Sequence, residues 1–334
     1  MRKLVKRIVF WLAVLLLGSI LTIVAFVNLH PTFGEEPETN QFASMDLHYY
    51  NGKTFTNLNP VKEEFSWSDY KKMIKLLFKS NPNRKPKEKL PQQNWKKDEL
   101  GQILDATTTA IWYGHSAFLL RMDGLNILLD PMFGNTPSPV PFLINPRFNS
   151  TLPIQVEDLP PIDLVVFSHD HYDHLDYGSI LKLKDKVKHF LVPLGVGNHL
   201  VKWGVEKNRI TELSWDQSTT YEGIRLVCTP AQHFSGRGLG SRMTTLWCSW
   251  VITGSNHNLY FSGDSGYFDG FKKIGDQYGP FDLCMMECGQ YNELWKDIHI
   301  MPEDTAQAHL DLKGKTLMPI HWGAFTLAMH DWND

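Results

Sequence analysis

The stretch Ser168-His169-Asp170-His171-Tyr172-Asp173-His174-Leu175-Asp176 places three imidazoles and three carboxylates within nine residues. It follows the run Asp163-Leu164-Val165-Val166-Phe167, which is typical of a buried β-strand. A strand that ends at alternating histidines and acids delivers these side chains to the end of a sheet. Imidazole nitrogens and carboxylate oxygens are ligands for Zn²⁺ and similar divalent ions, so the stretch predicts a metal site.

The spacing within this stretch has a geometric meaning. His169 and His171 are two residues apart, so they point to the same side of an extended segment. Asp173 and His174 are adjacent and point apart. One short loop therefore suits two metal ions lying close together. The alternative is a solvated polar loop with capping aspartates, which the density of histidines disfavours.

Three later segments repeat the pattern of an apolar run that ends at a residue able to bind a metal. They run from Leu226 to His233, from Leu259 to Asp264 and from Thr316 to His321. Taken singly, they are also compatible with a loop histidine, a turn-forming aspartate and a buried structural histidine. In series after the first motif, they predict one shared metal centre.

The pattern H-x-H-x-D-H resembles that of the metallo-β-lactamase superfamily of metal-dependent hydrolases. The resemblance implies an α/β fold, a four-layer αββα sandwich, whereas periodicity alone supports only mixed α and β structure. It also implies that His169, His171 and His233 hold one metal. Asp173, His174 and His321 would hold a second metal, and Asp264 would bridge the two. We expect two divalent ions, with Zn²⁺ as the expected metal.

Further segments are similar to the N-acyl-phosphatidylethanolamine phospholipase D-like branch of this superfamily. Examples are Trp112-Tyr113-Gly114-His115-Ser116, Gln232-His233-Phe234-Ser235-Gly236-Arg237 and Ile320-His321-Trp322-Gly323-Ala324-Phe325. The resemblance extends from about Ser44 to the C-terminus. The branch has Gly-Ala-Tyr where this chain has Gly289-Gln290-Tyr291, and relatives continue beyond Asp334, so we expect a C-terminal piece to be missing.

Three residues outside the ligand set are candidate substrate contacts: His115, Tyr291 and Trp322. The position of His115 lies near the site in relatives, and the alternative is a structural hydrogen bond beneath it. His299 is a further candidate for the wall of the pocket.

Composition limits the classes of function. The chain has 334 residues, enough for one large domain with extensions. Its net charge of −3 provides no basic field, so we expect no nucleic-acid partner. The four cysteines are too few for a disulfide scaffold and are expected to be mostly buried small hydrophobic residues.

The N-terminus predicts a membrane-spanning helix. Residues Ile8 to Val27 are almost all apolar, and about 20 such residues cross a bilayer. Four basic residues precede this run, and no lysine or arginine follows it until Lys53. The positive-inside rule therefore predicts a single-pass protein of the cell membrane with its main domain on the extracytoplasmic side. A cleaved signal peptide is the alternative.

We expect residues 1–30 to form this membrane anchor or signal segment, residues 31–105 an N-terminal extension, and residues 106–334 the hydrolase domain. Within the extension, Ser66 to Phe78 has helical periodicity and is expected to pack on the main domain. The basic stretch Ser80 to Lys87 is either a solvated linker or a contact for anionic lipid headgroups. Further helices are predicted at Tyr177–Leu183, Gly197–Trp203 and Pro302–Asp311.

Together these features predict a binuclear metal-dependent hydrolase that attacks with a hydroxide bridging the metals. Asp173 and Asp264 are the expected catalytic carboxylates, and Asp176 is expected to orient His171 or His174. The expected bond is a phosphodiester of an (N-acyl) phospholipid, cleaved as by a phospholipase D. The alternatives are hydrolysis of a lactone or a soluble phosphodiester, and a non-catalytic metal-binding membrane protein. The expected partner is a membrane lipid or a small-molecule substrate.

Overall fold

The computed structural model describes residues 2–61, 66–79, 81–97, 99 and 108–334. Two six-stranded sheets form its centre, with the orders β1-β2-β3-β4-β5-β6 and β12-β11-β10-β9-β8-β7. The first sheet comprises β1 (Thr109–Trp112), β2 (Phe118–Met122), β3 (Leu125–Leu129), β4 (Ile162–Val166), β5 (Val187–Pro193) and β6 (Ile210–Leu213). The second comprises β7 (Ser218–Tyr221), β8 (Ile224–Thr229), β9 (Ser249–Thr253), β10 (Asn258–Phe261), β11 (Phe281–Glu287) and β12 (Gly314–Ile320).

Each sheet joins an antiparallel half to a parallel half. Strands β1 to β3 pair antiparallel, and β3 to β6 pair parallel. Likewise β7 to β10 pair antiparallel, and β10 to β12 pair parallel. Parallel strands end at the same edge of a sheet, so the residues that follow them are brought together.

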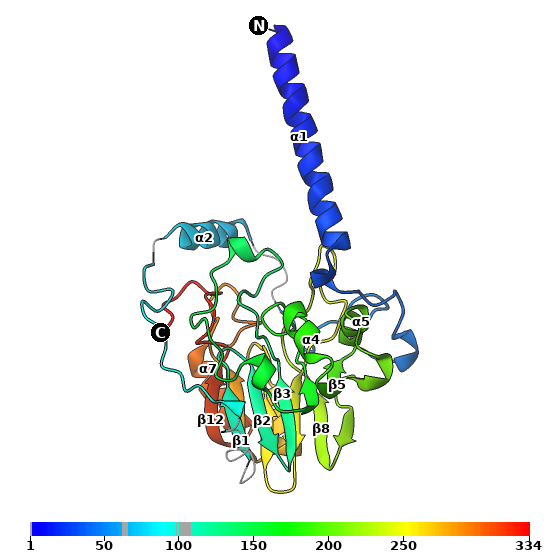
Figure 1. The fold of residues 1–334 in the computed structure, drawn as a ribbon, viewed down its shortest axis with the longest axis vertical. Helices are drawn as coiled ribbons and strands as arrows, with labels where there is room; N and C mark the ends of the chain where they lie inside the picture. Colours follow the sequence, from blue (N-terminus) through cyan, green and yellow to red (C-terminus); the bar gives the residue numbers. More distant parts are fainter. Residues whose placement is uncertain (1, 62–65, 80, 98, 100–107) are drawn as a thin grey trace.

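Alternation of side chains along the strands produces the layers. Phe118 and Leu120 of β2 face the core between the sheets, whereas Leu119 faces the helices α4 (Tyr177–Leu183) and α5 (Val196–Lys202). In β8, Leu226 faces the central core, and Val227 faces α6 (Gly270–Tyr278) and α7 (Pro302–Asp311). The predicted αββα sandwich is confirmed (Figure 1). The predicted helices are also present, α5 beginning one residue earlier than expected.

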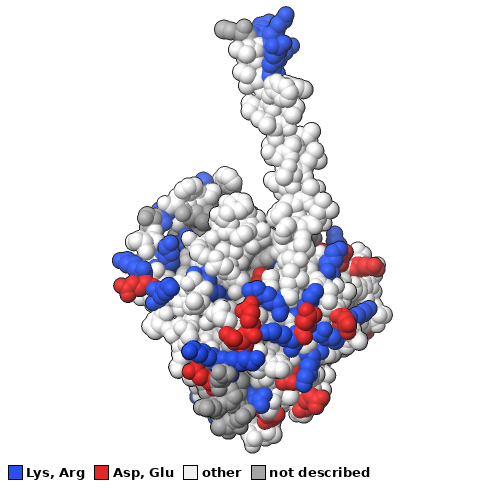
Figure 2. Space-filling model, in the orientation of Figure 1, with Lys and Arg blue, Asp and Glu red and all other residues white. Residues whose placement is uncertain are grey.

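The helix α1 (Arg2–Leu29) projects away from these layers and contains no buried residue. Its 28 residues correspond to about 42 Å, more than the hydrocarbon core of a bilayer. Figure 2 shows an uncharged column with Lys and Arg at its N-terminal tip. The chain thus has an N-terminal helix long and apolar enough to cross a membrane.

The extension after α1 is partly built into the sandwich. Phe42, Tyr49 and Phe55 are buried in the central core, and short 3₁₀ turns at η1 (Pro31–Phe33) and η2 (Ala43–Met45) carry the chain there. The expected boundary between residues 105 and 106 lies outside the described residues. Three of the four cysteines are buried free thiols, and Cys288 is half-buried.

One expectation for the extension is wrong in part. The predicted helix is present as α2 (Trp67–Phe78), with a capping box between Ser66 and Asp69. However, Trp67, Ile74 and Phe78 of the expected face are exposed, whereas Asp69 is buried and Met73 and Leu76 are half-buried. Periodicity correctly gave a helix with an apolar face, but it does not say what that face contacts. The side chain of Leu77 and all of Ser80 lie outside the described residues.

We predict that Trp250 couples the packing of the two sheets to the strand before the histidine-rich loop. It is fully buried in the central core, and its indole N–H donates to the carbonyl of Phe167 at 2.9 Å. Trp250→Phe should lower the free energy of unfolding by about 1–3 kcal/mol, because a buried acceptor loses its donor. Trp250→Ala should cost about 3–5 kcal/mol. Denaturant unfolding measures both changes. Leu310→Ala is the exposed control, and equal effects of all three substitutions would contradict the prediction.

Candidate metal centre

The loop of residues 168–176 is fixed at both ends. At its start, Ser168 donates its backbone N–H to Asp130 Oδ1 at 2.7 Å and its hydroxyl to Asp130 Oδ2 at 2.5 Å. At its end, Asp176 Oδ2 accepts from the backbone N–H of Ser179 at 2.7 Å and caps α4. The expectation that Asp176 orients His171 or His174 is therefore wrong, because its carboxylate is used by the helix.

The first group of ligand atoms is formed by His169, His171, His233 and Asp264, as predicted. His171 Nδ1 lies 2.9 Å from His169 Nε2 and 3.2 Å from His233 Nε2. Asp264 Oδ2 lies 3.8 Å from His169 Nε2 and 3.7 Å from His233 Nε2. One atom from each residue lies within 4.8 Å of the others, which is the arrangement of ligands around a single ion.

The second group contains Asp173, His174 and His321, again as predicted, and also His115. Asp173 Oδ2 lies 3.2 Å from His321 Nε2 and 3.6 Å from His174 Nε2. Asp264 Oδ1 lies 3.1 Å from His174 Nε2 and 3.2 Å from His321 Nδ1. Asp264 therefore faces the first group with one oxygen and the second group with the other, the position expected of a bridging carboxylate.

The outer nitrogens of these imidazoles are already hydrogen-bonded, so the inner nitrogens can present lone pairs. His233 Nδ1 donates to the carbonyl of Ile298 at 2.9 Å, and His174 Nδ1 donates to Asp130 Oδ2 at 2.7 Å. His169 Nδ1 lies 2.9 Å from Ser168 Oγ. The buried atoms His174 Nε2 and Asp264 Oδ1 lie 3.1 Å apart but form no hydrogen bond with each other or with another described residue. Buried polar atoms without partners are costly, and divalent ions would satisfy both. The residues present therefore fit the metals that the sequence predicts.

Two carboxylates that the sequence did not single out support the ligands. Asp130, directly after β3, orients His174. Glu287, the last residue of β11, accepts from His321 Nδ1 at 2.9 Å and also from His299 Nδ1. Both end an apolar strand, which is the same signal that identified the ligands themselves. His299 lies beside the centre, its ring 4.9 Å from that of His233.

The three candidate substrate contacts are placed differently. His115 is fully buried, and its Nε2 donates to Asp173 Oδ2 at 2.8 Å. Burial, with a smaller effect of His321, lowers the pKa of His115 to about 3, so its imidazole is neutral. Trp322 follows His321 and packs on Trp112. Tyr291 is stacked on His330 and is not among the clustered ligands. Their roles toward a substrate stay predictions.

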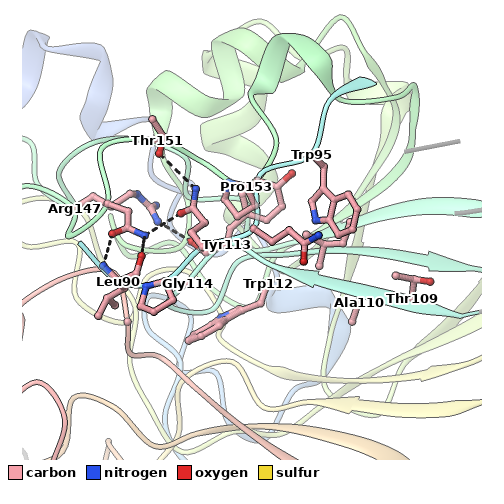
Figure 3. Close-up of a pocket in the computed structure, with 16 residues that line it drawn as sticks. Leu90, Trp95, Thr109, Ala110, Trp112, Tyr113, Gly114, Arg147, Thr151 and Pro153 are labelled. Carbon is pink, nitrogen blue, oxygen red and sulfur yellow. Dashed lines mark hydrogen bonds between the residues drawn. The ribbon is translucent and has the colours of Figure 1, made fainter. Parts of the chain in front are cut away.

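A separate cavity of about 360 Å³ is lined by residues of the extension and of the main domain (Figure 3). Its described lining includes Arg147, Asn149, Trp95 and Gly114 but none of the seven predicted ligands. Asn149 exchanges two hydrogen bonds with the backbone of Leu90, joining the extension to the sandwich. This cavity therefore belongs to the contact between the extension and the main domain.

The outer side of the metal loop is tied to the base of α1. The buried guanidinium of Arg237 donates to the backbone carbonyls of Asp170 and Leu175 in the loop, the latter at 2.7 Å. The same guanidinium donates to the carbonyl of Thr32 at 2.8 and 3.1 Å. The Cζ atom of this guanidinium lies 4.2 Å from the centre of the Tyr172 ring. One buried cation thus joins the loop that carries four of the candidate ligands to the residues that follow α1.

A family profile for the beta-lactamase superfamily domain matches residues 125–322, which include the metal loop and all three later ligands. The chain belongs to the metallo-β-lactamase superfamily. This superfamily chain is 48% identical over 235 residues to an uncharacterized protein of Mycobacterium tuberculosis, covering 69% of this chain and 63% of that one. It therefore spans about three-fifths of the length of that relative.

A second relative is named N-acyl-phosphatidylethanolamine-hydrolyzing phospholipase D 1, from Caenorhabditis elegans. It is 32% identical over 302 residues, covering 84% of each chain. A solved structure of a possible metal-dependent hydrolase from Veillonella parvula aligns with a TM-score of 0.54 at 17% identity, covering 68% of this chain and 89% of that one. At this identity the likeness supports the fold alone.

We predict that the orienting carboxylate Asp130 controls metal affinity. Asp130→Asn should weaken divalent-ion binding about 10- to 100-fold, because a neutral amide with one acceptor oxygen replaces the carboxylate that accepts from both Ser168 and His174 Nδ1–H. If the chain binds the two ions that the sequence predicts, Asp264→Asn should reduce this number to at most one. Competition with a chromophoric chelator and elemental analysis measure the two effects. Asp176→Asn is the matched control, since asparagine also caps helices. Unchanged metal content in Asp264→Asn would contradict the bridging role.

A second prediction concerns the metal-free protein. Burial alone would lower the pKa of His321, but Asp264, Glu287 and Asp173 outweigh it and raise the pKa to about 10. The protonated imidazole therefore stabilises the metal-free fold fully below its ordinary pKa of 6.5, and this stabilisation is lost as the pH rises to about 10. In chelator-treated samples, the protein with His321 should have a higher free energy of unfolding than His321→Gln at low pH. This difference should shrink as the pH rises from 6.5 to about 10. Thermal unfolding at several pH values measures it, and a constant or growing difference would refute the prediction.

Proposed function

We propose that this protein is a two-metal hydrolase that cleaves a phosphodiester bond of a membrane phospholipid, as a phospholipase D does. The observation that carries the proposal is that two groups of candidate ligands share Asp264 and lie beside the base of α1, which the loop of residues 168–176 contacts. The ring of Tyr172, within the loop, lies 6.3 Å from that of Phe33, directly after α1. A lipid substrate would therefore lie close to the metal centre without leaving the bilayer surface.

The chemistry of the ligand set supports hydrolysis. Two bound divalent ions, with zinc as the metal expected for this set of nitrogens and oxygens, would acidify a water molecule and offset negative charge on a phosphodiester. Asp264 would hold both sites at a fixed separation. His115 would keep Asp173 oriented through its hydrogen bond of 2.8 Å, and Glu287 would do the same for His321. Groups that are preorganised in this way stabilise the charge of the transition state without having to move during the reaction.

The surroundings of the site favour an anionic substrate. The exposed Arg242 places its guanidinium 4.1 Å above the ring of Phe234. That ring in turn lies 4.5 Å from the ring of His171. The ring of Phe234 thus lies between the guanidinium of Arg242 and the imidazole of His171. A guanidinium so near a candidate metal ligand favours binding of a phosphate group. The relative named as a phospholipase D supports the same substrate class.

We also propose that α1 anchors the protein in the cell membrane with the sandwich on the extracytoplasmic side. Arg2, Lys3, Lys6 and Arg7 precede the apolar run, and Glu35, Glu36 and Glu38 follow it. This distribution of basic residues supports a cytoplasmic N-terminus.

The full chain, reconstituted in nanodiscs and analysed for metal, tests the activity. The substrate panel contains N-acyl phosphatidylethanolamine, phosphatidylcholine, a lactone and bis(p-nitrophenyl) phosphate. We expect phosphatidic acid from the phospholipids, because phospholipase D cleavage leaves the phosphate on the lipid. Release of diacylglycerol or of a free fatty acid would indicate that the protein cleaves a different bond of the phospholipid. Turnover of the lactone alone, or of the soluble diester alone, would replace the lipid assignment, and metal without any turnover would refute the enzyme.

Asp173→Asn should lower kcat/KM at least about 100-fold, a loss comparable to that of other groups that stabilise a transition state. Asp176→Asn changes the same functional group three residues away but only at the helix cap, so its kcat/KM should stay close to that of the unchanged protein. Equal losses in both variants would indicate general damage to the loop rather than a role for Asp173.

A further inference from the structure

Large apolar side chains are exposed at the end of the molecule from which α1 projects. On α2, Trp67 is 74% exposed, Ile74 is 51% exposed and Phe78 is 87% exposed. The spacings of seven and four residues place them on one face of the helix. Exposed apolar residues grouped in this way mark a contact surface rather than ordinary scatter.

Two other segments also expose large apolar side chains. In η3 (Pro141–Leu143), Phe142 is 84% exposed and Leu143 is 71% exposed. Leu239 is 77% exposed. Its neighbour Gly238 lies against the base of α1, where a Cβ would be 3.8 Å from side-chain atoms of Val27 and Phe33. We call the exposed residues of these three segments the interfacial surface: Trp67, Ile74, Phe78, Phe142, Leu143 and Leu239.

Basic side chains accompany the apolar ones. Lys71, Lys72, Lys75 and Lys79 are all exposed in or directly after α2. Lys85, Lys87 and Lys89 are exposed in the segment that follows. A helix with lysines beside a stripe of Trp, Ile and Phe is typical of helices that lie in the headgroup region of a bilayer. Each lysine near an anionic membrane contributes about 1 kcal/mol to the free energy of membrane binding.

The position of these segments relative to α1 identifies the partner. Figure 1 shows α2 level with the base of α1, at the end of the sandwich nearest to it. In Figure 2, blue side chains lie along the flank of this region, and its upper surface is largely uncharged. A bilayer crossed by α1 would therefore meet α2 at the depth where headgroups and acyl chains join.

We propose that the interfacial surface is a second membrane contact, which lies in the headgroup region of the bilayer spanned by α1 and prefers anionic lipid. A single spanning helix leaves the molecule free to tilt, so the distance of the sandwich from the bilayer surface is not fixed. A second contact on separate segments fixes the orientation of the sandwich, and the metal loop beside α1 is then held toward the lipid. The proposal does not depend on which bond the metal centre cleaves.

The test uses the full chain in nanodiscs that hold one copy each. An environment-sensitive nitrobenzoxadiazole label is attached to Phe78→Cys or Phe142→Cys. Asn256→Cys is the control, since it is exposed in the β9–β10 turn at the opposite end of the sandwich. The unsubstituted chain, in which three cysteines are buried and Cys288 is half-buried, gives the background. Both test positions are exposed, so the substitutions leave the core unchanged.

We expect blue-shifted emission and several-fold slower reduction by dithionite at positions 78 and 142 than at position 256. The effect should strengthen as phosphatidylglycerol replaces phosphatidylcholine and weaken in a variant that combines Lys71→Gln and Lys75→Gln. Reduction at the same rate at all three positions would overturn the proposal. In a parallel set of discs loaded with two copies, protection that appears there and not in the single-copy discs would overturn it in favour of self-association. Protection independent of phosphatidylglycerol would overturn the lipid preference.

Discussion

The structure depends on the burial of one carboxylate among imidazoles. Asp264 is almost fully buried, and its two oxygens face His169 and His233 on one side and His174 and His321 on the other. Burial would raise the pKa of Asp264, yet His174, His321 and His169 outweigh it and hold the pKa well below the usual range. Removing such a charge from water costs several kcal/mol unless cations compensate for it. The strand ends of both sheets converge on this carboxylate and supply that compensation.

Much of this centre could be predicted because its ligands follow strands. His169, His233, Asp264 and His321 each come shortly after an apolar run, and parallel strands bring such positions to one edge. Asp130 and Glu287 obey the same rule but carry no distinctive neighbours, so the sequence did not separate them from ordinary turn residues. His115 was found through resemblance, but its bond to Asp173 depends on the meeting of β1–β2 with the end of β12.

The two wrong expectations have one physical origin. Periodicity and residue type describe what a segment can do locally, whereas its partner is set by the tertiary fold. Asp176 has the chemistry to orient a histidine, but α4 begins at the next residue and takes its carboxylate as a cap. The periodicity of α2 predicts an apolar face, but it does not determine which side of the helix is covered, and Trp67, Ile74 and Phe78 are left exposed.

The Arg237 contact makes the segment after α1 part of the metal loop's support. A protease that cut the chain shortly after Thr32 would separate α1 and Thr32 from the rest of the chain. The carbonyl of Thr32 would then no longer be held at the guanidinium of Arg237. A buried cation would then lose an acceptor directly beneath the ligands, while its bonds to Asp170 and Leu175 remained. A form of this protein without α1 would therefore differ from the full chain at the metal loop as well as at its N-terminus.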